Sequence, residues 1–189
     1  MSSEQEKLQK RKDESAVKEV ISWIITLALA VVAALFVKNY VLINANIPSG
    51  SMENTIMTGD RLFGYRLAYR QKNPERGDII IFKFPDDETE NYVKRVIGLP
   101  GVTVEIEDAR IYINGSKVPL QENYLKEEWT VATGQYSFEV PEDCYLVLGD
   151  NRNNSYDARY WDNTYVSKDK ILGKAMFRYY PFGNAGSLY

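Results

Sequence analysis

The amino-acid sequence predicts a mainly β protein, in which one N-terminal transmembrane helix precedes a compact, β-barrel-like domain. Three observations lead to this fold class. An uncharged apolar run covers residues 20–37, short β-branched and aromatic runs alternate with turn residues after it, and no long amphipathic helix follows. We expect a cytoplasmic tail at 1–19, the membrane helix at 20–40 and an extracytoplasmic domain at 41–189.

The apolar run is long enough to cross a bilayer. Its residues, Val20 to Val37, carry no charge, and as a helix they would span roughly 27 Å, against about 30 Å of bilayer hydrocarbon. Several lysines and arginines precede the run, whereas only Lys38 follows it before Arg61. The positive-inside rule therefore predicts a single-pass protein of the cell membrane, with its N-terminus in the cytoplasm and the rest of the chain outside.

Two other interpretations of this run are weaker. A cleaved signal peptide would have a shorter apolar core, and here Lys38 interrupts the stretch before the small residue Ala45. A buried helix of a soluble protein would carry a polar stripe at helical spacing, but apolar residues cover every face of this one.

Seven segments after the anchor are typical of strands, because β-branched and aromatic residues gather in short runs bounded by turn residues. They are residues 78–84, 91–97, 102–106, 109–113, 136–140, 144–148 and 171–180. The dipeptide Asn114-Gly115 is predicted to close a hairpin as a type I′ turn. The polar segments 85–91, 119–134 and 151–169 are expected to be loops.

The composition excludes several kinds of site. A net charge of −3 with scattered cations argues against a nucleic-acid partner. The single cysteine, Cys144, excludes an internal disulfide and a multi-cysteine metal site. Because the chain has no histidine, catalysis of the Ser-His-Asp or Cys-His kind is impossible, and any acid–base chemistry must use Lys, Asp, Glu or Tyr. We expect no metal and no cofactor.

Ser51 follows the anchor closely. It lies in Pro48-Ser49-Gly50-Ser51-Met52, a sequence typical of a tight turn. A serine after a glycine is usually a turn residue or a helix cap. Ser51 is nevertheless only 13 residues past Lys38, so an extended chain would keep it within roughly 45 Å of the bilayer surface. Whatever Ser51 does, it does beside the membrane.

Lys94 lies in a predicted strand in which two cationic residues, Lys94 and Arg95, are adjacent. Because side chains alternate between faces, Lys94 and Arg95 point to opposite sides, and one of the two cations must face apolar neighbours. An ordinary lysine would lay its stem along the sheet and extend its ammonium into water. A buried lysine would instead have a lowered pKa and could take a proton from a serine hydroxyl. In a chain without histidine it is the only strong base available near neutral pH.

The segment from Gly149 to Arg159 contains both acids and arginines. Its Asp/Asn run is compatible with a calcium loop, but Arg152 and Arg159 would oppose a bound cation. A hydrogen-bonded scaffold of acid–arginine pairs fits the charges better, and Ser155 within it could orient a nearby amine.

Five segments, in this order, resemble the sequence boxes of type I signal peptidases. They are Pro48–Met52, Gly59–Arg61, Arg76–Phe82, Tyr92–Gly101 and Gly149–Arg159. With the anchor, the resemblance covers about residues 20–180, and the short span between Lys94 and Gly149 is similar to the compact Gram-positive form of the family. Two positions depart from the family pattern: Ala158 stands where serine is frequent, and Asn54 replaces a frequent proline.

The resemblance implies a serine endopeptidase that removes signal peptides from exported preproteins, cleaving after small residues in an Ala-x-Ala pattern. It implies that Ser51 is the nucleophile, that Lys94 is the general base, and that the Ser49 hydroxyl and the Ser51 N–H form the oxyanion hole. It also implies that Ser155 orients Lys94. The residues expected to brace the site are Asp150, Arg152, Asp157 and Arg159.

Preproteins and membrane lipid are the expected partners. The substrate should bind in an extended form, as a strand added beside the sheet. Candidates for the side chains lining its pockets are Ile47, Met52 and Ile81.

A membrane-anchored β-barrel binding module without catalysis is the main alternative. In such a module Ser51 would be a turn residue, and Lys94 would be solvent-exposed and more than about 6 Å from it. A self-cleaving serine/lysine protease of the repressor type shares the chemistry, but the spanning helix argues against it. A penicillin-binding enzyme would need a lysine where Asn54 stands.

Overall fold

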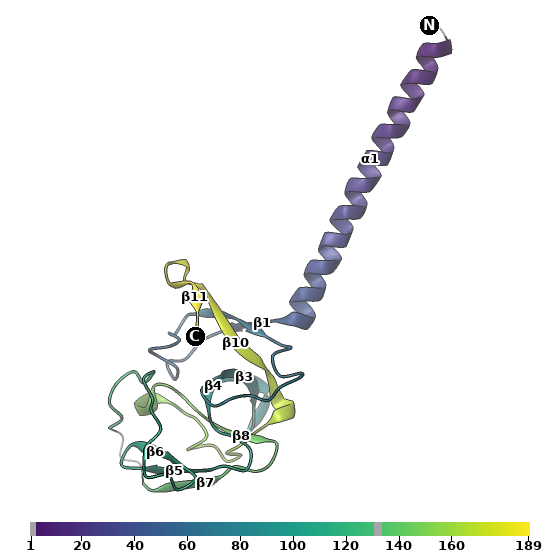
Figure 1. The fold of residues 1–189 in the computed structure, drawn as a ribbon. Coiled ribbons are helices and arrows are strands. Elements are labelled where there is room, and N and C mark those ends of the chain that lie inside the picture. Colours follow the sequence, from purple (N-terminus) through teal and green to yellow (C-terminus); the bar gives the residue numbers. More distant parts are fainter. Residues whose placement is uncertain (1–2, 131–133) are drawn as a thin grey trace. The chain divides into compact units, whose positions relative to one another are not determined.

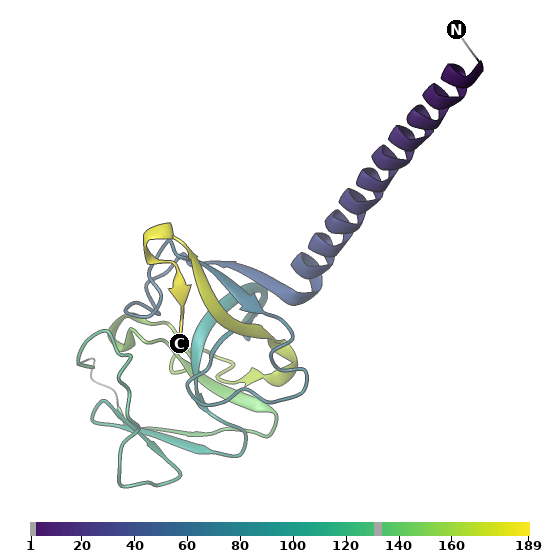
Figure 2. The ribbon, with the colours of Figure 1, turned by 45° about the horizontal axis from the view of Figure 1, so that its top comes forward.

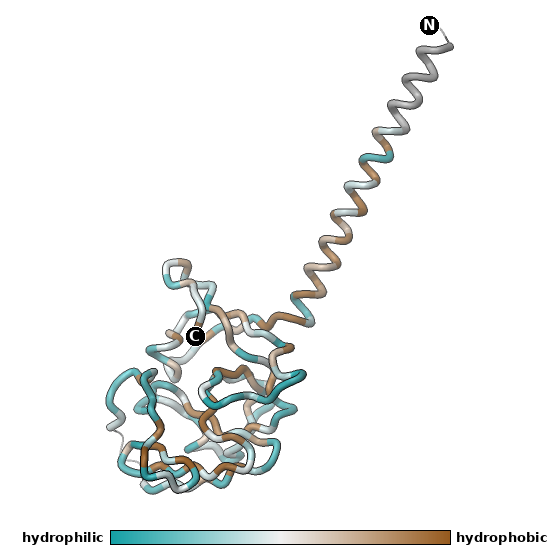
Figure 3. The backbone as a smooth tube through the Cα atoms, viewed as in Figure 1, coloured by the Kyte–Doolittle hydropathy of each residue, from teal (hydrophilic) through white to brown (hydrophobic). Residues whose placement is uncertain are grey.

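The computed structural model describes residues 3–130 and 134–189 and divides the chain into two units, up to Val41 and from Leu42 to Tyr189. In the first unit, helix α1 (Ser3–Phe36) continues into a π-helical turn, η1 (Val37–Val41) (Figure 1). The stretch from Ser15 to Val41 is long and apolar enough to cross a membrane (Figure 3), and none of its most apolar window is buried. A helix of a soluble core would be mostly buried, so this exposure argues against that interpretation.

The second unit is built from antiparallel strands, which confirms the mainly β prediction. The main sheet has the order β1 (Leu42–Asn46), β2 (Arg61–Tyr65), β10 (Ile171–Tyr180), β3 (Ile79–Phe84), β4 (Asp87–Gly98), β8 (Cys144–Leu148) and β9 (Val166–Ser167), with β11 (Gly186–Ser187) added to β10. A second sheet has the order β6 (Arg110–Ile113), β5 (Thr103–Glu107) and β7 (Tyr136–Glu139) (Figure 2).

The main sheet is curved rather than closed. Among the described residues its strand order has two ends, β1 and β9, so the expected barrel describes the curvature only. In the described part of this unit, helix is limited to three short 3₁₀ turns, which are η2 (Arg152–Asn154), η3 (Lys168–Lys170) and η4 (Phe182–Asn184).

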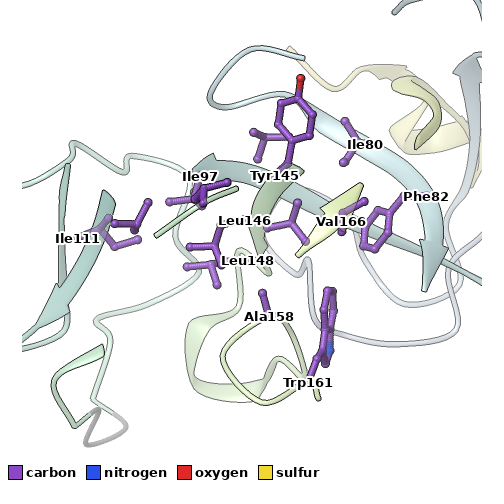
Figure 4. Close-up of a cluster of buried hydrophobic side chains, with 14 of the residues drawn as sticks. Ile80, Phe82, Ile97, Ile111, Tyr145, Leu146, Leu148, Ala158, Trp161 and Val166 are labelled. Atoms are coloured by element: carbon purple, nitrogen blue, oxygen red, sulfur yellow. The ribbon is translucent and has the colours of Figure 1, made fainter. Parts of the chain in front are cut away.

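Strand β3 separates two hydrophobic clusters. Ile80 and Phe82 belong to the larger cluster (Figure 4), whereas Ile79 and Ile81 belong to the smaller one. All four side chains are at most 1% exposed, and a fully buried side chain of this size contributes about 1.5–3 kcal/mol to folding. Strand β4, which pairs with β3, is therefore held in a rigid layer with apolar packing on both sides.

The hairpin between β5 and β6 is closed by a different dipeptide from the one predicted. Glu107 pairs with Arg110, so Asp108 and Ala109 form the two-residue turn, with φ of 48° and 57°. Asn114 and Gly115 also have positive φ, but they follow β6 instead of joining two strands. The prediction was wrong because a type I′ turn here uses an Asp-Ala pair, which lacks the usual glycine.

Segment 85–91 was predicted as a loop, but Asp87 to Asn91 belong to β4. These residues are exposed, so they lack the apolar alternation from which a strand is predicted. Strands β1 and β2 were also missed. Gly64 lies within β2 and interrupts the apolar pattern of its sequence. Glycine is needed there because a Cβ would come within 2.6 Å of Ile81 Cδ1 and 3.2 Å of the Lys174 carbonyl oxygen.

Candidate active site

Ser51 lies in a turn between β1 and β2 that is closed at its base. The Ile47 N–H donates to the Asp60 carbonyl oxygen (3.0 Å), and the Gly59 N–H donates to the Ile47 carbonyl oxygen (2.8 Å). Inside the turn, Met52 and Ile56 are buried in the smaller hydrophobic cluster. We call residues 49–56 the nucleophile turn, after the role that the sequence predicts for Ser51. Its buried side chains and its closed base restrict its conformation.

The residues after β8 contact the backbone of this turn directly. The Asn151 N–H donates to the Ser51 carbonyl oxygen (3.0 Å), and Asn151 Nδ2 donates to that of Gly50 (2.9 Å). A Cβ on Gly149 would lie 2.4 Å from the Ser51 carbonyl oxygen and 2.1 Å from Ser155 Oγ. Only glycine lets the two segments approach so closely.

Lys94 reaches Ser51 from β4. Its Nζ lies 2.5 Å from Ser51 Oγ, although the two residues are 43 positions apart. Lys94 is 3% exposed. Burial lowers the pKa of Lys94 from 10.5 to about 8, an effect that Asp157 and Asp150 oppose and Arg159 reinforces. A neutral amine is therefore accessible near physiological pH, within hydrogen-bond distance of a hydroxyl.

Arg95, the next residue, is also buried. Alternation required only one of the two cations to face apolar neighbours, but Arg95 is 6% exposed. Its charge is compensated by Asp150, which accepts from Nε (2.8 Å) and Nη2 (2.6 Å). Among the described residues no carboxylate forms a salt bridge with Lys94, so the two buried cations differ in kind: Arg95 stays charged in a bidentate pair, and Lys94 is free to lose its proton.

Two further acid–arginine pairs lie beside this one. Asp157 pairs with Arg159 (2.8 Å) and accepts the Gly149 N–H (2.9 Å). Arg152, however, pairs outside its own segment: its Nη1 and Nη2 donate to Glu122 at 2.9 and 2.6 Å. Sequence reasoning missed Glu122, because an isolated glutamate in an expected loop gives no signal.

The two remaining serines differ in their surroundings. Ser49 Oγ is 3.4 Å from Ser51 Oγ, on the exposed side of the turn. Ser155 is 7% exposed, and its Oγ has no hydrogen-bond partner among the residues that the structure describes. That Ser155 orients Lys94 stays a prediction.

A groove of about 630 Å³ opens over the Ser51–Lys94 contact. Residues 46–52 form one wall and residues 90–94 of β4 the other, with Asn154 and Tyr156 at its margin. Of the predicted pocket residues, Ile47 and Met52 line this groove. Ile81 is not among its lining residues and lies in the smaller hydrophobic cluster.

The groove wall on β4 has a free edge. Strand β4 pairs with β3 along most of its length, but β8 pairs with it only from Arg95 to Gly98. In the part of the chain that the structure describes, no strand pairs with residues 91–94 on the side away from β3, so their backbone groups are open to a further strand.

Both departures from the family pattern have a local explanation. Ala158 is 1% exposed and belongs to the larger hydrophobic cluster with Leu148 and Trp161 (Figure 4), where a serine hydroxyl would need a partner. Asn54 has a φ of 88°, which proline cannot adopt.

Comparison with known proteins identifies the family of the chain. The model of the family "Signal peptidase, peptidase S26" matches residues 20–180. The chain is 40% identical over 169 residues to a probable signal peptidase I-2 of Synechocystis, covering 86% of this chain and 74% of that protein. It is 42% identical to a signal peptidase I of Leptolyngbya laminosa (86% and 81% covered) and 36% identical to one of Bacillus licheniformis (86% and 90%).

A crystal structure of a signal peptidase I from Enterococcus faecalis V583 is 38% identical, covers 55% of this chain and 97% of its own, and aligns with a TM-score of 0.46.

The family match and the identities confirm that the chain is a serine peptidase rather than a binding module. Together with the apolar N-terminal helix, they also confirm a membrane-anchored protein. Residues 20–180 carry both the site and the match, and the chain accordingly belongs to the signal peptidase family, peptidase S26.

Proposed function

We propose that this chain removes signal peptides from exported preproteins, with Ser51 as nucleophile and Lys94 as general base. The observation that carries the proposal is the 2.5 Å contact between Lys94 Nζ and Ser51 Oγ, made by a buried amine in a chain without histidine. The curated relatives are named signal peptidase I, which supports the same substrate class.

The arrangement supports an acyl-enzyme mechanism. Neutral Lys94 takes the proton of Ser51 Oγ while that oxygen attacks the scissile carbonyl carbon. The resulting ammonium gives its proton to the leaving amine, and the peptide bond breaks to leave an ester on Ser51. Lys94 then accepts a proton from water, which attacks the ester, and the serine departs with its hydroxyl restored.

Activity should rise with pH, because only neutral Lys94 can act as a base. The pKa of Lys94 is lowered to about 8, so most of the amine is protonated at pH 6 and nearly all of it is neutral at pH 10. We expect the logarithm of kcat/KM to rise with pH with a slope of one below about pH 8 and to level off above it. This parameter reports the titrating groups of the free enzyme. A profile that is flat between pH 6 and 9 would exclude Lys94 as the titrating base.

Ser49 is proposed to stabilise the oxyanion, together with the Ser51 N–H. The Ser49 hydroxyl lies beside the Ser51 hydroxyl, and one such donor typically raises kcat by a factor of about 10²–10³. Replacing Ser49 with alanine should lower kcat by that factor and leave KM and the melting temperature unchanged. Threonine at this position retains a hydroxyl and should restore most of the rate. Equal losses for alanine and threonine would contradict the role.

The substrate is proposed to bind as an extended strand against the free edge of β4. Alternate side chains of a strand point to the same face, so two substrate residues separated by one would both enter the groove beside Ile47 and Met52. Small side chains at those two positions are what an Ala-x-Ala preference requires. The preference itself rests on the family resemblance.

We also propose that residues 1–19 are cytoplasmic, that 20–40 span the membrane and that 41–189 lie outside. The bias of lysine and arginine toward the N-terminal side of the apolar run supports this orientation. Protease added to intact spheroplasts should then degrade the domain, and protection of the domain would reverse the orientation.

The decisive experiment is cleavage of a preprotein by the detergent-solubilised full chain. The new N-terminus should follow an Ala-x-Ala sequence. Ser51→Ala, which removes only the nucleophilic oxygen, should give no product. Cleavage by Ser51→Ala at the same bond would refute the proposed nucleophile.

A further inference from the structure

Residues 122–129, in the segment expected to be a loop, contact three parts of the active site. We call this segment the strap. Its first contact is with the nucleophile turn: Asn54 Nδ2 donates to the carbonyl oxygens of Tyr124 (3.1 Å) and Leu125 (3.3 Å). Asn54 is three residues from Ser51 in sequence, and 70 or more from its partners.

The second contact is with Arg95. Its guanidinium carbon lies 3.9 Å from the centre of the Tyr124 ring, an arrangement in which the ring face attracts the cation. Arg95 is the neighbour of Lys94 on β4 and holds Asp150 in a bidentate pair. Tyr124 therefore covers the compensated cation beside the base.

The third contact is with the arginines that follow β8. Glu122 forms the bidentate pair with Arg152, and these side chains are 7% and 1% exposed. The Tyr124 hydroxyl donates to the same carboxylate (2.6 Å), and the Trp129 ring lies 5.2 Å from the guanidinium carbons of Arg152 and Arg159. The Glu122 side chain and Trp129 are thus buried against these arginines, and Glu122 is fixed by charge-assisted bonds.

These contacts link the two halves of the proposed dyad through side chains that touch neither reacting atom. We propose that the strap is a positioning device, in which Asn54 holds the nucleophile turn and Tyr124 holds Arg95, so that Ser51 Oγ and Lys94 Nζ stay in contact. The proposal rests on the proposed function. Asn54 and Tyr124 are positioning residues, since they act through Ser51 and Lys94.

Asn54 stands at a position where this chain departs from the family pattern. Where the family often has proline, this chain has a residue with a φ of 88° whose amide donates to the strap. Proline could neither adopt this φ nor donate a hydrogen bond. The residue that departs from the family pattern is thus also the residue that bonds to the strap.

The test uses Asn54→Gly and Tyr124→Leu in the detergent-solubilised full chain. Glycine tolerates the positive φ, so Asn54→Gly removes the amide without straining the backbone. Asn114→Gly is its matched control, because Asn114 also has positive φ (52°) and bonds the backbone, at the Thr103 N–H, outside the site. Tyr112→Leu, on β6, is the control for Tyr124→Leu.

We expect each strap variant to lower kcat for preprotein cleavage about tenfold, since misplacement of reacting groups by about 1 Å can cost as much as 10²-fold. KM and the melting temperature should equal those of the matched controls. Tyr124→Phe, which keeps the ring over Arg95, should retain at least half of the wild-type kcat. The double variant should lose less than the product of the two single losses, because both act through one segment.

Amide hydrogen exchange gives a second readout that needs no catalysis. Both strap variants should speed exchange in peptides covering residues 50–56, and neither control should. Kcat and exchange rates equal to those of the controls, within twofold, would overturn the proposal. Failure of the proposed function looks different: the wild-type chain would leave the preprotein intact.

Discussion

Replacing Lys94 with methionine should abolish preprotein cleavage and at the same time stabilise the folded chain. Methionine fills a similar volume but supplies no base, so we expect kcat to fall by at least about 10⁴, as when a unit of nucleophile and base is broken. The stability gain follows from linkage. Folding lowers the pKa of Lys94 from 10.5 to about 8, so burial of this amine costs up to about 3 kcal/mol below pH 8.

The sign of this effect gives the prediction a signature. Between pH 8 and 10.5 the unfolded chain holds one more proton than the folded chain, so the wild-type free energy of unfolding rises with pH in this window. The advantage of Lys94→Met should therefore be full at pH 7 and vanish by about pH 10.5. Denaturant unfolding of both chains at the two pH values measures it. A variant less stable than wild type at pH 7 would mean that the lost contact with Ser51 outweighs the cost of burial.

Replacing Gly149 with alanine should remove most of the activity and much of the stability. The added Cβ would lie 2.4 Å from the Ser51 carbonyl oxygen and 2.1 Å from Ser155 Oγ. The Ser51 carbonyl oxygen is a backbone atom, so it can move only if the nucleophile turn moves. Overpacking of this kind costs about 1–3 kcal/mol or more, and a shift of about 1 Å at Ser51 should cost about 10² in kcat.

Gly183→Ala is the matched control, because a Cβ at Gly183 meets no atom within 4 Å. The control should keep the wild-type kcat and melting temperature. If Gly149→Ala also kept them, the packing of β8 against the nucleophile turn would be looser than the distances indicate. Thermal unfolding and the cleavage assay together decide between these outcomes.

The sequence was sufficient to predict the strands with an apolar face and insufficient for those without one. Strand β5 alternates as predicted, with Val104 and Ile106 fully buried. The first half of β4 is charged and exposed, and it becomes a strand only because it continues a hairpin with β3. Such a strand is stabilised by pairing across the sheet, which single-chain periodicity does not encode.

The proposed dyad was predictable for a different reason. Without histidine the number of possible bases is small, and the order of the sequence boxes pointed to Ser51 and Lys94. Their contact depends on the register of β4 against β3, where Lys94 pairs with Ile80. Glu122 and Tyr124 could not be found in this way, because their roles follow from where a long irregular segment lies. No local pattern indicates this.

The unpaired edge of β4 has a consequence for the behaviour of many copies of the chain in one membrane. An exposed strand edge is a template for any extended segment, including the same edge of another copy, and so invites aggregation. Here the hairpin end of the edge carries the exposed carboxylates of Asp87 and Glu90, beside Glu88, whose charge is compensated by Lys170. Two such edges repel each other, whereas a single incoming peptide without acidic residues meets no such barrier. Like-charge repulsion thus disfavours pairing between the β4 edges of two copies, while the edge stays accessible to peptides without acidic residues.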